Sequence, residues 1–216
     1  MKKIFASLLA ASMMLVAFNA NAQLSAGAGY LNANDKSVYT ASDNTKTTTE
    51  TPLNGFYVGA QYDMPIPAVS GLGVNAGLYA NFLFANKHYD GLLGLGAGTN
   101  KATDITLNIP INATFGFDLS GDTNVFAYAG PIFQFGLVNK STFTPDSGSS
   151  STSTDNFGGD DPARNRFNLL IGGGIGAQVA GIRVVLGVDQ SLLNYSTAKN
   201  TVASRFQLKL GVGYAF

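Results

Sequence analysis

The feature that most constrains this chain is an alternation of apolar with polar or small side chains, repeated every second residue along most of its length. From Thr103 to Phe117 nearly all odd positions are apolar, while the even positions between them are polar or small. Because the side chains of a β-strand point alternately to its two faces, this pattern predicts a strand with one apolar face. Residues 202–216 repeat the pattern and predict another such strand.

Six further segments alternate in the same way, which makes eight predicted strands: residues 24–30, 56–64, 72–84, 125–135, 167–175 and 182–188. Four connections are long and polar (34–52, 85–101, 138–163 and 194–201), and the three that alternate with them are short (65–71, 119–123 and 180–181). In an up-and-down sheet all long connections then lie at one end, as in outer-membrane barrels. The sequence therefore predicts an all-β fold, an eight-stranded antiparallel up-and-down transmembrane β-barrel.

Two kinds of barrel fit this pattern, and they differ in the direction of the apolar face. A lipocalin-like barrel in water has its apolar face inside, whereas a transmembrane barrel turns that face to lipid and has a polar lumen. Charged residues make up only 12% of the chain, while a well-solvated surface carries about 25–35%. The polar faces are also rich in glycine, which suits a crowded lumen. We therefore predict that the apolar faces contact lipid.

Aromatic residues on the apolar faces gather near the strand ends, as in the two girdles of a membrane barrel. The predicted girdle at the end with short turns contains Tyr62, Phe115, Phe117, Tyr214 and Phe216. The girdle at the other end contains Phe56, Phe82, Phe84, Phe133, Phe135, Phe167 and Phe206. The chain has no Trp, so Phe and Tyr take its usual place in these girdles.

The first 22 residues have the features of a secretory signal peptide. Two lysines follow the initial Met, residues 4–18 are an apolar run, and residues 20–22 form an Ala-x-Ala cleavage site. The run is too short for a membrane-anchor helix, since spanning a bilayer needs about 20 apolar residues. We predict a signal peptide over residues 1–22, a barrel domain over residues 23–216, and export to the outer membrane of a Gram-negative bacterium.

Composition excludes several classes of protein. The 13 basic and 13 acidic residues balance, which argues against a nucleic-acid-binding protein with its basic face. The chain has no Cys, which excludes disulfide scaffolds, thiolate zinc sites and cysteine nucleophiles. We expect no cofactor and a monomer that contacts outer-membrane lipid, with an extracellular ligand or envelope protein still to be identified.

Three stretches carry a resemblance to a known family: residues 107–111 (Leu-Asn-Ile-Pro-Ile), 126–131 (Phe-Ala-Tyr-Ala-Gly-Pro) and 172–177 (Gly-Gly-Gly-Ile-Gly-Ala). In this order they resemble the outer-membrane β-barrel domain proteins of Bacteroidetes that are often called PorT-like. The resemblance covers nearly the whole mature chain and implies fold and location more than activity. At the end of the chain, a pattern similar to the signal bound by the barrel-assembly machinery is formed by Leu210, Val212, Tyr214 and Phe216.

Eight strands enclose a space that side chains can just fill. The charged residues predicted to face it are Asp63, Asp104, Arg164, Arg166, Arg183, Asp189, Arg205 and Lys209. Asp189 lies on the strand before the one that carries Arg205 and Lys209, so we expect an ion pair there. Under one hypothesis these charges neutralise one another in a plugged lumen, and under the other they line a narrow ion pathway. The charge balance and the small barrel favour the plug.

The predicted outer loops offer two candidates for chemistry. His88, the single histidine, stands in a Lys-His-Tyr-Asp sequence near the outer mouth, where a lipid hydrolase or protease would place its active site. A solvated loop histidine is the simpler interpretation. Residues 156–161 cluster oxygen ligands for calcium without the spacing of a known calcium loop. We therefore predict no catalytic residue and no metal site.

The remaining segments predict local structure. Residues 45–51 are rich in Thr and could extend the first hairpin, since Thr favours strands. Residues 147–154 form a flexible tip of small polar residues. The apolar, Gly-rich residues 91–98 would dip into the outer leaflet or cover the barrel mouth, and they lack the Lys-Ser/Thr of a phosphate cradle. Pro131 predicts a bulge or bend in the fifth strand, because it removes a ladder donor.

These observations favour a structural or surface-interaction protein, not an enzyme, that displays four extracellular loops. A small-solute pore is one alternative, and it would need an open lumen. An outer-membrane hydrolase would need His88. A PorT-like secretion accessory would need a protein partner in the envelope.

Overall fold

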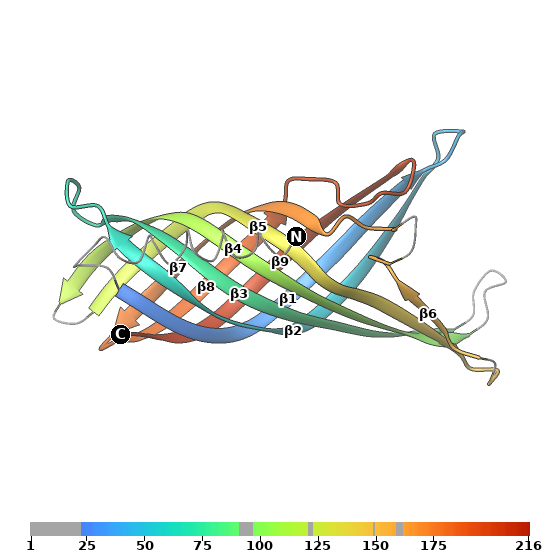
Figure 1. Ribbon diagram of the computed structural model, residues 1–216, viewed down its shortest axis with the longest axis horizontal. Helices are drawn as coiled ribbons and strands as arrows, with labels where there is room; N and C mark the ends of the chain where they lie inside the picture. Colours follow the sequence, from blue (N-terminus) through green and yellow to red (C-terminus); the bar gives the residue numbers. More distant parts are fainter. Residues whose placement is uncertain (1–22, 91–96, 121–122, 149, 159–161) are drawn as a thin grey trace.

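The computed structural model describes residues 23–90, 97–120, 123–148, 150–158 and 162–216 (Figure 1). The predicted signal peptide lies outside the described residues. The strands are β1 (Gln23–Thr40), β2 (Lys46–Pro65), β3 (Leu72–Tyr89), β4 (Gly98–Ser120), β5 (Thr123–Pro145), β6 (Thr152–Asp155), β7 (Phe167–Val179), β8 (Ile182–Ser191) and β9 (Thr201–Ala215). Across the described ranges, no helix has the length and apolar character needed to cross a membrane.

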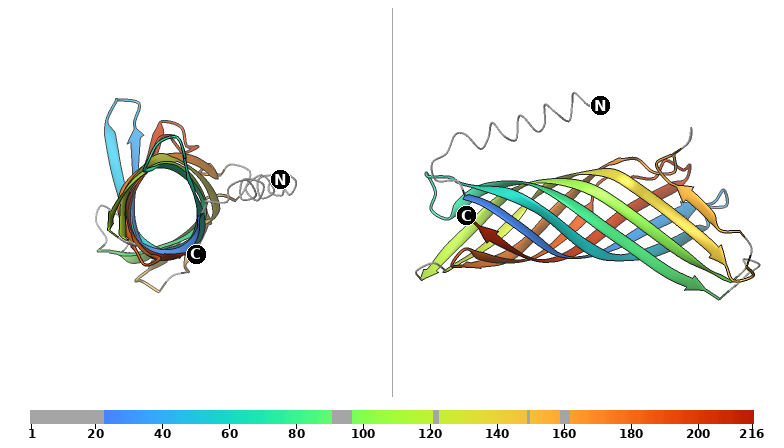
Figure 2. Two further views of the ribbon diagram at one scale, coloured as in Figure 1. Left: turned by 90° about the vertical axis from the view of Figure 1, so that its left-hand side faces the viewer. Right: turned by 60° about the horizontal axis from the view of Figure 1, so that its bottom comes forward.

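Eight of these strands close into a ring. Antiparallel neighbours follow the order β4-β3-β2-β1-β9-β8-β7-β5, and β4 also pairs with β5. Seen end-on, the strands surround a single lumen (Figure 2). β6 lies outside the ring and pairs only with residues 140–143 of β5. The predicted eight-stranded up-and-down barrel is confirmed.

Three connections that we predicted as long loops contain strand residues, and in the one predicted over residues 85–101 β3 runs to Tyr89 and β4 begins at Gly98. β1 and β2 continue as a paired hairpin, so the connection predicted over residues 34–52 is reduced to residues 41–45. β5 runs to Pro145, and β6 occupies part of the connection predicted over residues 138–163. The expected extension by residues 45–51 is confirmed, since Thr47–Thr51 pair with β1. Polarity alone misled the loop prediction, because paired strands that leave the membrane need no apolar face.

The two turns at opposite ends of the barrel have different local chemistry. In the β1–β2 turn, the backbone N–H of Thr45 donates to the Asp43 carboxylate at 2.9 Å, and this hydrogen bond lowers the pKa of Asp43. At the other end, Ala180 and Gly181 link β7 to β8 with φ values of 48° and 84°. Positive φ at both residues is typical of a two-residue type I′ hairpin, which confirms the predicted short connection.

Of the bulge or bend that we predicted at Pro131, the structure excludes the bulge. Pairing with β4 is interrupted at Pro131, but the register is the same on both sides, so Pro131 is not a bulge. The shift in register lies instead at Leu137, opposite the step from Ile105 to Thr106. A missing N–H removes one ladder hydrogen bond without requiring an extra residue, which explains the difference.

The interior of the ring is mostly polar, and one apolar cluster lies between β1, β2 and β3, while Phe126, Ile132 and Leu170 are buried apolar residues outside that cluster. The members of the cluster are Leu31, Ala33, Leu53, Tyr57 and Leu83. We predicted a lumen of polar and small residues, so this cluster is a difference. It forms because the alternation inverts in β1, where Asn32 and Asn34 take the outer face while Leu31 and Ala33 take the inner one.

Candidate functional site

The wall of the barrel is apolar outside and polar inside. Ile175, Leu186 and Val212 are 62%, 46% and 57% exposed on the outer face. Asn75 and Gln134 are buried on the inner face. An exposed apolar band around a polar interior suits lipid and not water, which excludes the lipocalin-like alternative. The chain is therefore a transmembrane β-barrel, the class that occupies the outer membrane of Gram-negative bacteria.

Aromatic rings contact one another on this outer face. At the end with short turns, Phe115 and Phe117 have ring centroids 4.7 Å apart, and Tyr214 lies against Phe216. At the other end the rings of Phe56 and Phe82 stack at 4.9 Å, and Phe135 lies 5.3 Å from Phe167. Members of each predicted girdle thus pack together at the two interfaces.

Near the outer end, four charged side chains cross the lumen, and we call Asp35, Asp104, Arg164 and Arg205 the outer charge layer. Arg205 donates from Nε and Nη2 to the two oxygens of Asp35 at 2.5 and 2.8 Å. Its Nη2 also donates to Asp104. Arg164 Nη1 lies 2.7 Å from Asp35 Oδ2. The side chains of Arg205, Asp35 and Asp104 are 3%, 6% and 4% exposed, so these three are almost closed to solvent, while Arg164 is partly exposed.

Tyr195, in the connection between β8 and β9, packs against this layer. The guanidinium carbons of Arg164 and Arg205 lie 5.1 and 6.0 Å from the centre of its ring. Burial, together with the nearby Asp35 carboxylate, raises the pKa of Tyr195, so its hydroxyl stays neutral. Burial lowers the pKa of Arg164, but the Asp35 carboxylate outweighs it and the net shift is upward. The β8–β9 connection therefore covers the outer charge layer, and its Tyr195 ring contacts the two arginines of that layer.

A second ion pair lies deeper in the lumen. Lys209 Nζ is 2.8 Å from Asp189 Oδ2, and the Asp189 side chain is 0% exposed. Of the two cations expected beside Asp189, the structure brings only Lys209 to it, because Arg205 is held by Asp35 and Asp104.

The end with short turns has its own ion pair, Asp63 with Arg183, which we call the inner charge pair. Arg183 Nη1 lies 2.6 Å from Asp63 Oδ2. The Arg183 guanidinium carbon is 4.1 Å from the centre of the Phe126 ring. The two side chains are 10% and 23% exposed, for Arg183 and Asp63 respectively. Asp63 is therefore partly open to solvent.

Glycines on the lumen face make room for tyrosine side chains between these charges. A Cβ at Gly29 would lie 2.7 Å from Tyr57 Cε1, and one at Gly211 would overlap the Tyr57 hydroxyl. A Cβ at Gly187 would likewise overlap the hydroxyl of Tyr128. These glycines are required by close approach of the rings, which explains much of the glycine on the polar faces.

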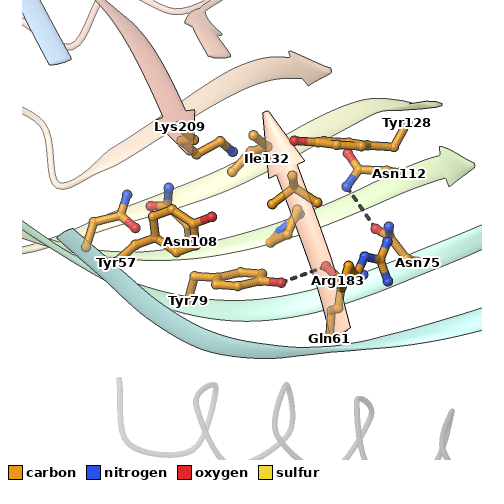
Figure 3. Close-up of a pocket in the computed structure, with 13 residues that line it drawn as sticks. Tyr57, Gln61, Asn75, Tyr79, Asn108, Asn112, Tyr128, Ile132, Arg183 and Lys209 are labelled. Carbon is orange, nitrogen blue, oxygen red and sulfur yellow. Dashed lines mark hydrogen bonds between the residues drawn. The ribbon is translucent and has the colours of Figure 1, made fainter. Parts of the chain in front are cut away.

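Between the two ends lies a cavity of about 60 Å³, which we call the chamber (Figure 3). Tyr57, Tyr79 and Tyr128 line it, together with Arg183 and Lys209. At the end with short turns a larger space of about 870 Å³, which we call the funnel, opens between the strands. Of the residues that the structure describes, Arg183 alone lines both spaces, so its side chain lies between the chamber and the funnel.

Arg166 and Asp35 are the two charged residues for which the prediction of lumen charges differs from the structure. Arg166 does not pair with a carboxylate in the described structure: it is exposed and donates from Nη1 to the carbonyl of Gly136 at 3.3 Å. Asp35 was not among the predicted lumen residues, because it fell within a predicted loop. The signal that could have found it is the continuation of the alternation from Leu31 through Ala33 to Asp35.

His88 lies at the outer rim. Its Nδ1 is 3.3 Å from the Thr99 hydroxyl, and its Nε2 is 3.4 Å from Asp90 and 3.6 Å from Asp146. The His88 side chain is 52% exposed. Within the described ranges, no group of three or more His, Cys, Asp or Glu residues could hold a metal ion. Residues 159–161 of the candidate calcium segment, and residues 91–96 of the apolar loop, lie outside the described residues.

The C-terminal pattern is on the lipid face. Leu210, Val212 and Tyr214 are 52%, 57% and 50% exposed, and Phe216 is 72% exposed. All four lie on one side of β9 or at its end, in the orientation that the alternation predicts.

Comparison with known proteins gives no family for this chain, and its structural matches are distant. No protein-family model matches the chain, and no curated protein matches its sequence. Among solved structures, Ail, the attachment invasion locus protein of Yersinia pestis, is 11% identical, with 88% of this chain and 99% of that chain covered and a TM-score of 0.37. The neisserial surface protein NspA is 13% identical, with 88% and 97% covered and a TM-score of 0.37.

The outer membrane enzyme PagL is 10% identical, with 84% of this chain and 98% of that chain covered and a TM-score of 0.38. At such identities and scores, the similarity says nothing of ligand, partner or activity. The assignment to the class of transmembrane barrels comes from the strand pairing and the lipid-facing wall of this chain.

Proposed function

We propose that this protein is a non-conducting outer-membrane barrel whose role is to hold its outer hairpins at the cell surface for interaction with other molecules. The observation that carries this proposal is the outer charge layer. Asp35, Asp104 and Arg205 fill the lumen with side chains that are almost fully buried. A lumen closed in this way leaves the outward surface as the part of the barrel that meets other molecules.

The outer hairpins extend well past the closed ring. β1 and β2 stay paired up to Thr40 and Lys46, whereas β2 pairs with β3 only as far as Asn54. On the other side, β6 widens the hairpin of β4 and β5 with residues that are all exposed. The two projections diverge from the barrel in Figure 1. Short turns of such barrels face the periplasm, so these projections face outward.

The orientation can be tested by labelling single cysteines, because the native chain has none. Ser42→Cys lies in the β1–β2 turn and Ser70→Cys in the β2–β3 turn, and both positions are exposed. With a membrane-impermeant maleimide, intact cells should label Ser42→Cys, while Ser70→Cys should react only after the outer membrane is permeabilised. The reverse pattern would refute display of the long hairpins.

A finer assignment to the PorT-like proteins of Bacteroidetes remains part of this proposal. The three stretches that carry the resemblance lie on β4, β5 and β7, which are consecutive neighbours in the ring. The three stretches therefore form one continuous part of the barrel wall, which supports the assignment. A secretion-accessory role would then use the projecting hairpins or the periplasmic turns to contact an envelope protein.

The same proposal covers His88 and the C-terminal residues. A half-exposed imidazole between two carboxylates at the rim favours a solvated surface cluster over a desolvated active site, so we infer no enzymatic role. The outward row from Leu210 to Phe216 supports recognition by the barrel-assembly machinery, because the row is accessible from the lipid side.

A further inference from the structure

We propose that the outer edge of β2, at the tip of the first hairpin, binds a second copy of this chain by antiparallel strand pairing. We call residues 46–51 the tip edge. The inference rests on the proposed display of the hairpins, because it names the partner of one of them. Three features of the tip edge support it: its unpaired backbone groups, the positions of its two charges, and its direction relative to the membrane.

The tip edge has one neighbouring strand, whereas the rest of β2 has two. Residues 46–51 pair with β1. Pairing with β3 begins only at Asn54 and continues inward, and among the described residues no other strand pairs with the tip edge. Residues 46–50 are all exposed. A row of unpaired backbone groups of this kind is a template for pairing with another strand.

The hydrogen bonds of the hairpin show which backbone groups point away from β1. Thr40 lies opposite Lys46, and its N–H donates at 2.9 Å to the carbonyl of Asn200, on the side away from β2. Directly opposed residues of an antiparallel pair either exchange both hydrogen bonds or direct both sets of groups outward. Lys46 therefore directs its N–H and C=O away from β1. The period of two along the strand gives the same direction to Thr48 and Glu50.

Pro52 is the next position of this kind, and it accounts for the end of the pairing with β3. Proline has no N–H, so it cannot donate a ladder hydrogen bond toward β3. The pairing stops just inside Pro52, at Asn54, and the hairpin of β1 and β2 diverges from β3 and β4 beyond it (Figure 1). The tip edge is thus kept apart from β3 and remains accessible.

The side chains of the tip edge are complementary to those of a second copy. When two copies pair antiparallel with Thr48 opposite Thr48, Lys46 of each copy lies opposite Glu50 of the other. This register also joins the outward backbone groups of all three residues. Threonine pairs and opposite charges at directly opposed positions both stabilise a sheet.

Both charges are available for this contact. Among the ion pairs of the described residues, none includes Lys46 or Glu50. Glu50 Oε2 accepts one hydrogen bond from Asn34 Nδ2 at 3.2 Å. The other carboxylate oxygen of Glu50 can therefore accept from Lys46 of the second copy.

The direction of the strand determines how the two barrels lie. Within one membrane, both copies of β2 would run from the outside toward the lipid, so they could pair only in the same direction. In register, such pairing puts Lys46 beside Lys46 and Glu50 beside Glu50, which like charges disfavour. Antiparallel pairing instead puts the barrels at opposite ends of the joined edge. The tip edge therefore suits a contact between two membranes that face each other.

The first test exchanges the charges in the refolded full chain, held in lipid nanodiscs with one barrel each. Native discs should pair reversibly in analytical ultracentrifugation. Lys46→Glu and Glu50→Lys should each weaken this pairing by about tenfold or more, because each then brings like charges together at both contacts. A mixture of the two variants should pair as tightly as the native chain, since opposite charges meet again.

Lys101→Glu is the matched control, because it makes the same change at an exposed lysine of β4, and it should pair like the native chain. A mixture that pairs no better than either variant alone would overturn the proposal. Native discs that do not associate would also overturn it and would indicate a strand of a different protein as the partner.

A second test uses single cysteines, since the native chain has none. Thr48→Cys places two thiols opposite each other with Cα atoms about 5.5 Å apart, within the range of a disulfide. At the exposed neighbour, Thr47→Cys leaves the two thiols on a diagonal with Cα atoms about 7–8 Å apart, beyond that range. Mild oxidation of the discs should link Thr48→Cys and not Thr47→Cys. Equal linking of both variants, or none of Thr48→Cys, would overturn the proposal.

These outcomes are distinguishable from failure of the proposed function. A reversed labelling pattern of Ser42→Cys and Ser70→Cys on cells refutes display of the hairpins. Discs that fail to pair, with the expected labelling pattern on cells, refute only the second copy as the partner.

Discussion

The outer charge layer and the inner charge pair close the same lumen in different ways. In the outer layer, Asp35 and Arg205 come from neighbouring strands, Asp104 reaches them from β4, and Arg164 covers them from a connection. The inner pair joins only β2 and β8. The outer carboxylates are 6% and 4% exposed, whereas Asp63 is 23% exposed and borders the funnel.

We infer from this difference that closure of the lumen depends on how many charged partners each side chain has. The presence of a single ion pair is not enough. Asp35 pairs with two arginines at once and Arg205 pairs with two carboxylates, so each member of the layer fixes the position of the others. Asp63 has one arginine partner and some access to water. We therefore expect the outer layer to be both the main barrier to ions and the more sensitive of the two regions to mutation.

The largest expected effect is that of Asp35→Asn. The substitution leaves Arg205 and Arg164 facing each other with one buried carboxylate fewer, and breaking a buried network of this kind costs about 3–5 kcal/mol. Urea unfolding in vesicles, followed by circular dichroism, would measure this loss in the free energy of unfolding. The matched control is Asp63→Asn, for which we expect about 1 kcal/mol because the pair is partly solvated.

Equal losses for Asp35→Asn and Asp63→Asn would break the comparison, since they would mean that the extra partners of Asp35 contribute nothing. A larger loss for Asp63→Asn would reverse it and make the inner charge pair the main structural element of the lumen.

A smaller effect is expected within the outer layer itself. The Arg164 side chain is 25% exposed and belongs to a connection, so Arg164→Gln should reduce the free energy of unfolding by about 1 kcal/mol or less. Arg166→Gln is the control, since Arg166 is exposed and has no carboxylate partner in the described structure, and we expect a change within about 0.5 kcal/mol. The same unfolding assay applies. A loss for Arg164→Gln as large as that for Asp35→Asn would place the main partner of Asp35 in the connection and not on β9.

The number of strands in the ring, the topology and the lipid-facing side were predictable from the sequence because each depends on local alternation, whereas β6, which lies outside the ring, was not predicted. From residues 103–117 the period of two is unambiguous, and β4 contains that whole segment. The Thr-rich residues 45–51 indicated that the first hairpin could be longer, but the outer half of β1 was predicted as a loop, because it has polar residues on both faces of a hairpin that leaves the membrane. Asn34 and Asp35 fell within the predicted loop, yet they pair with β2.

The partners of the charged side chains were less predictable than their positions. Alternation placed Asp104, Arg183 and Arg205 on the lumen face, but which carboxylate meets which cation depends on the distance across the ring and the register of strands far apart in sequence. Asp35 and Arg205 are separated by 170 positions and are direct neighbours in the β1–β9 register. No local pattern contains that information.

Single-channel recording of the refolded native chain in a planar bilayer tests the central claim most directly, after heat-modifiable migration has shown that the barrel is folded. A closed outer charge layer predicts no discrete openings, while the doubly substituted Arg183→Ser, Arg205→Ser barrel, which lacks the cation of each seal, should conduct. Salt-dependent openings of the native chain would contradict the account and make the protein a pore.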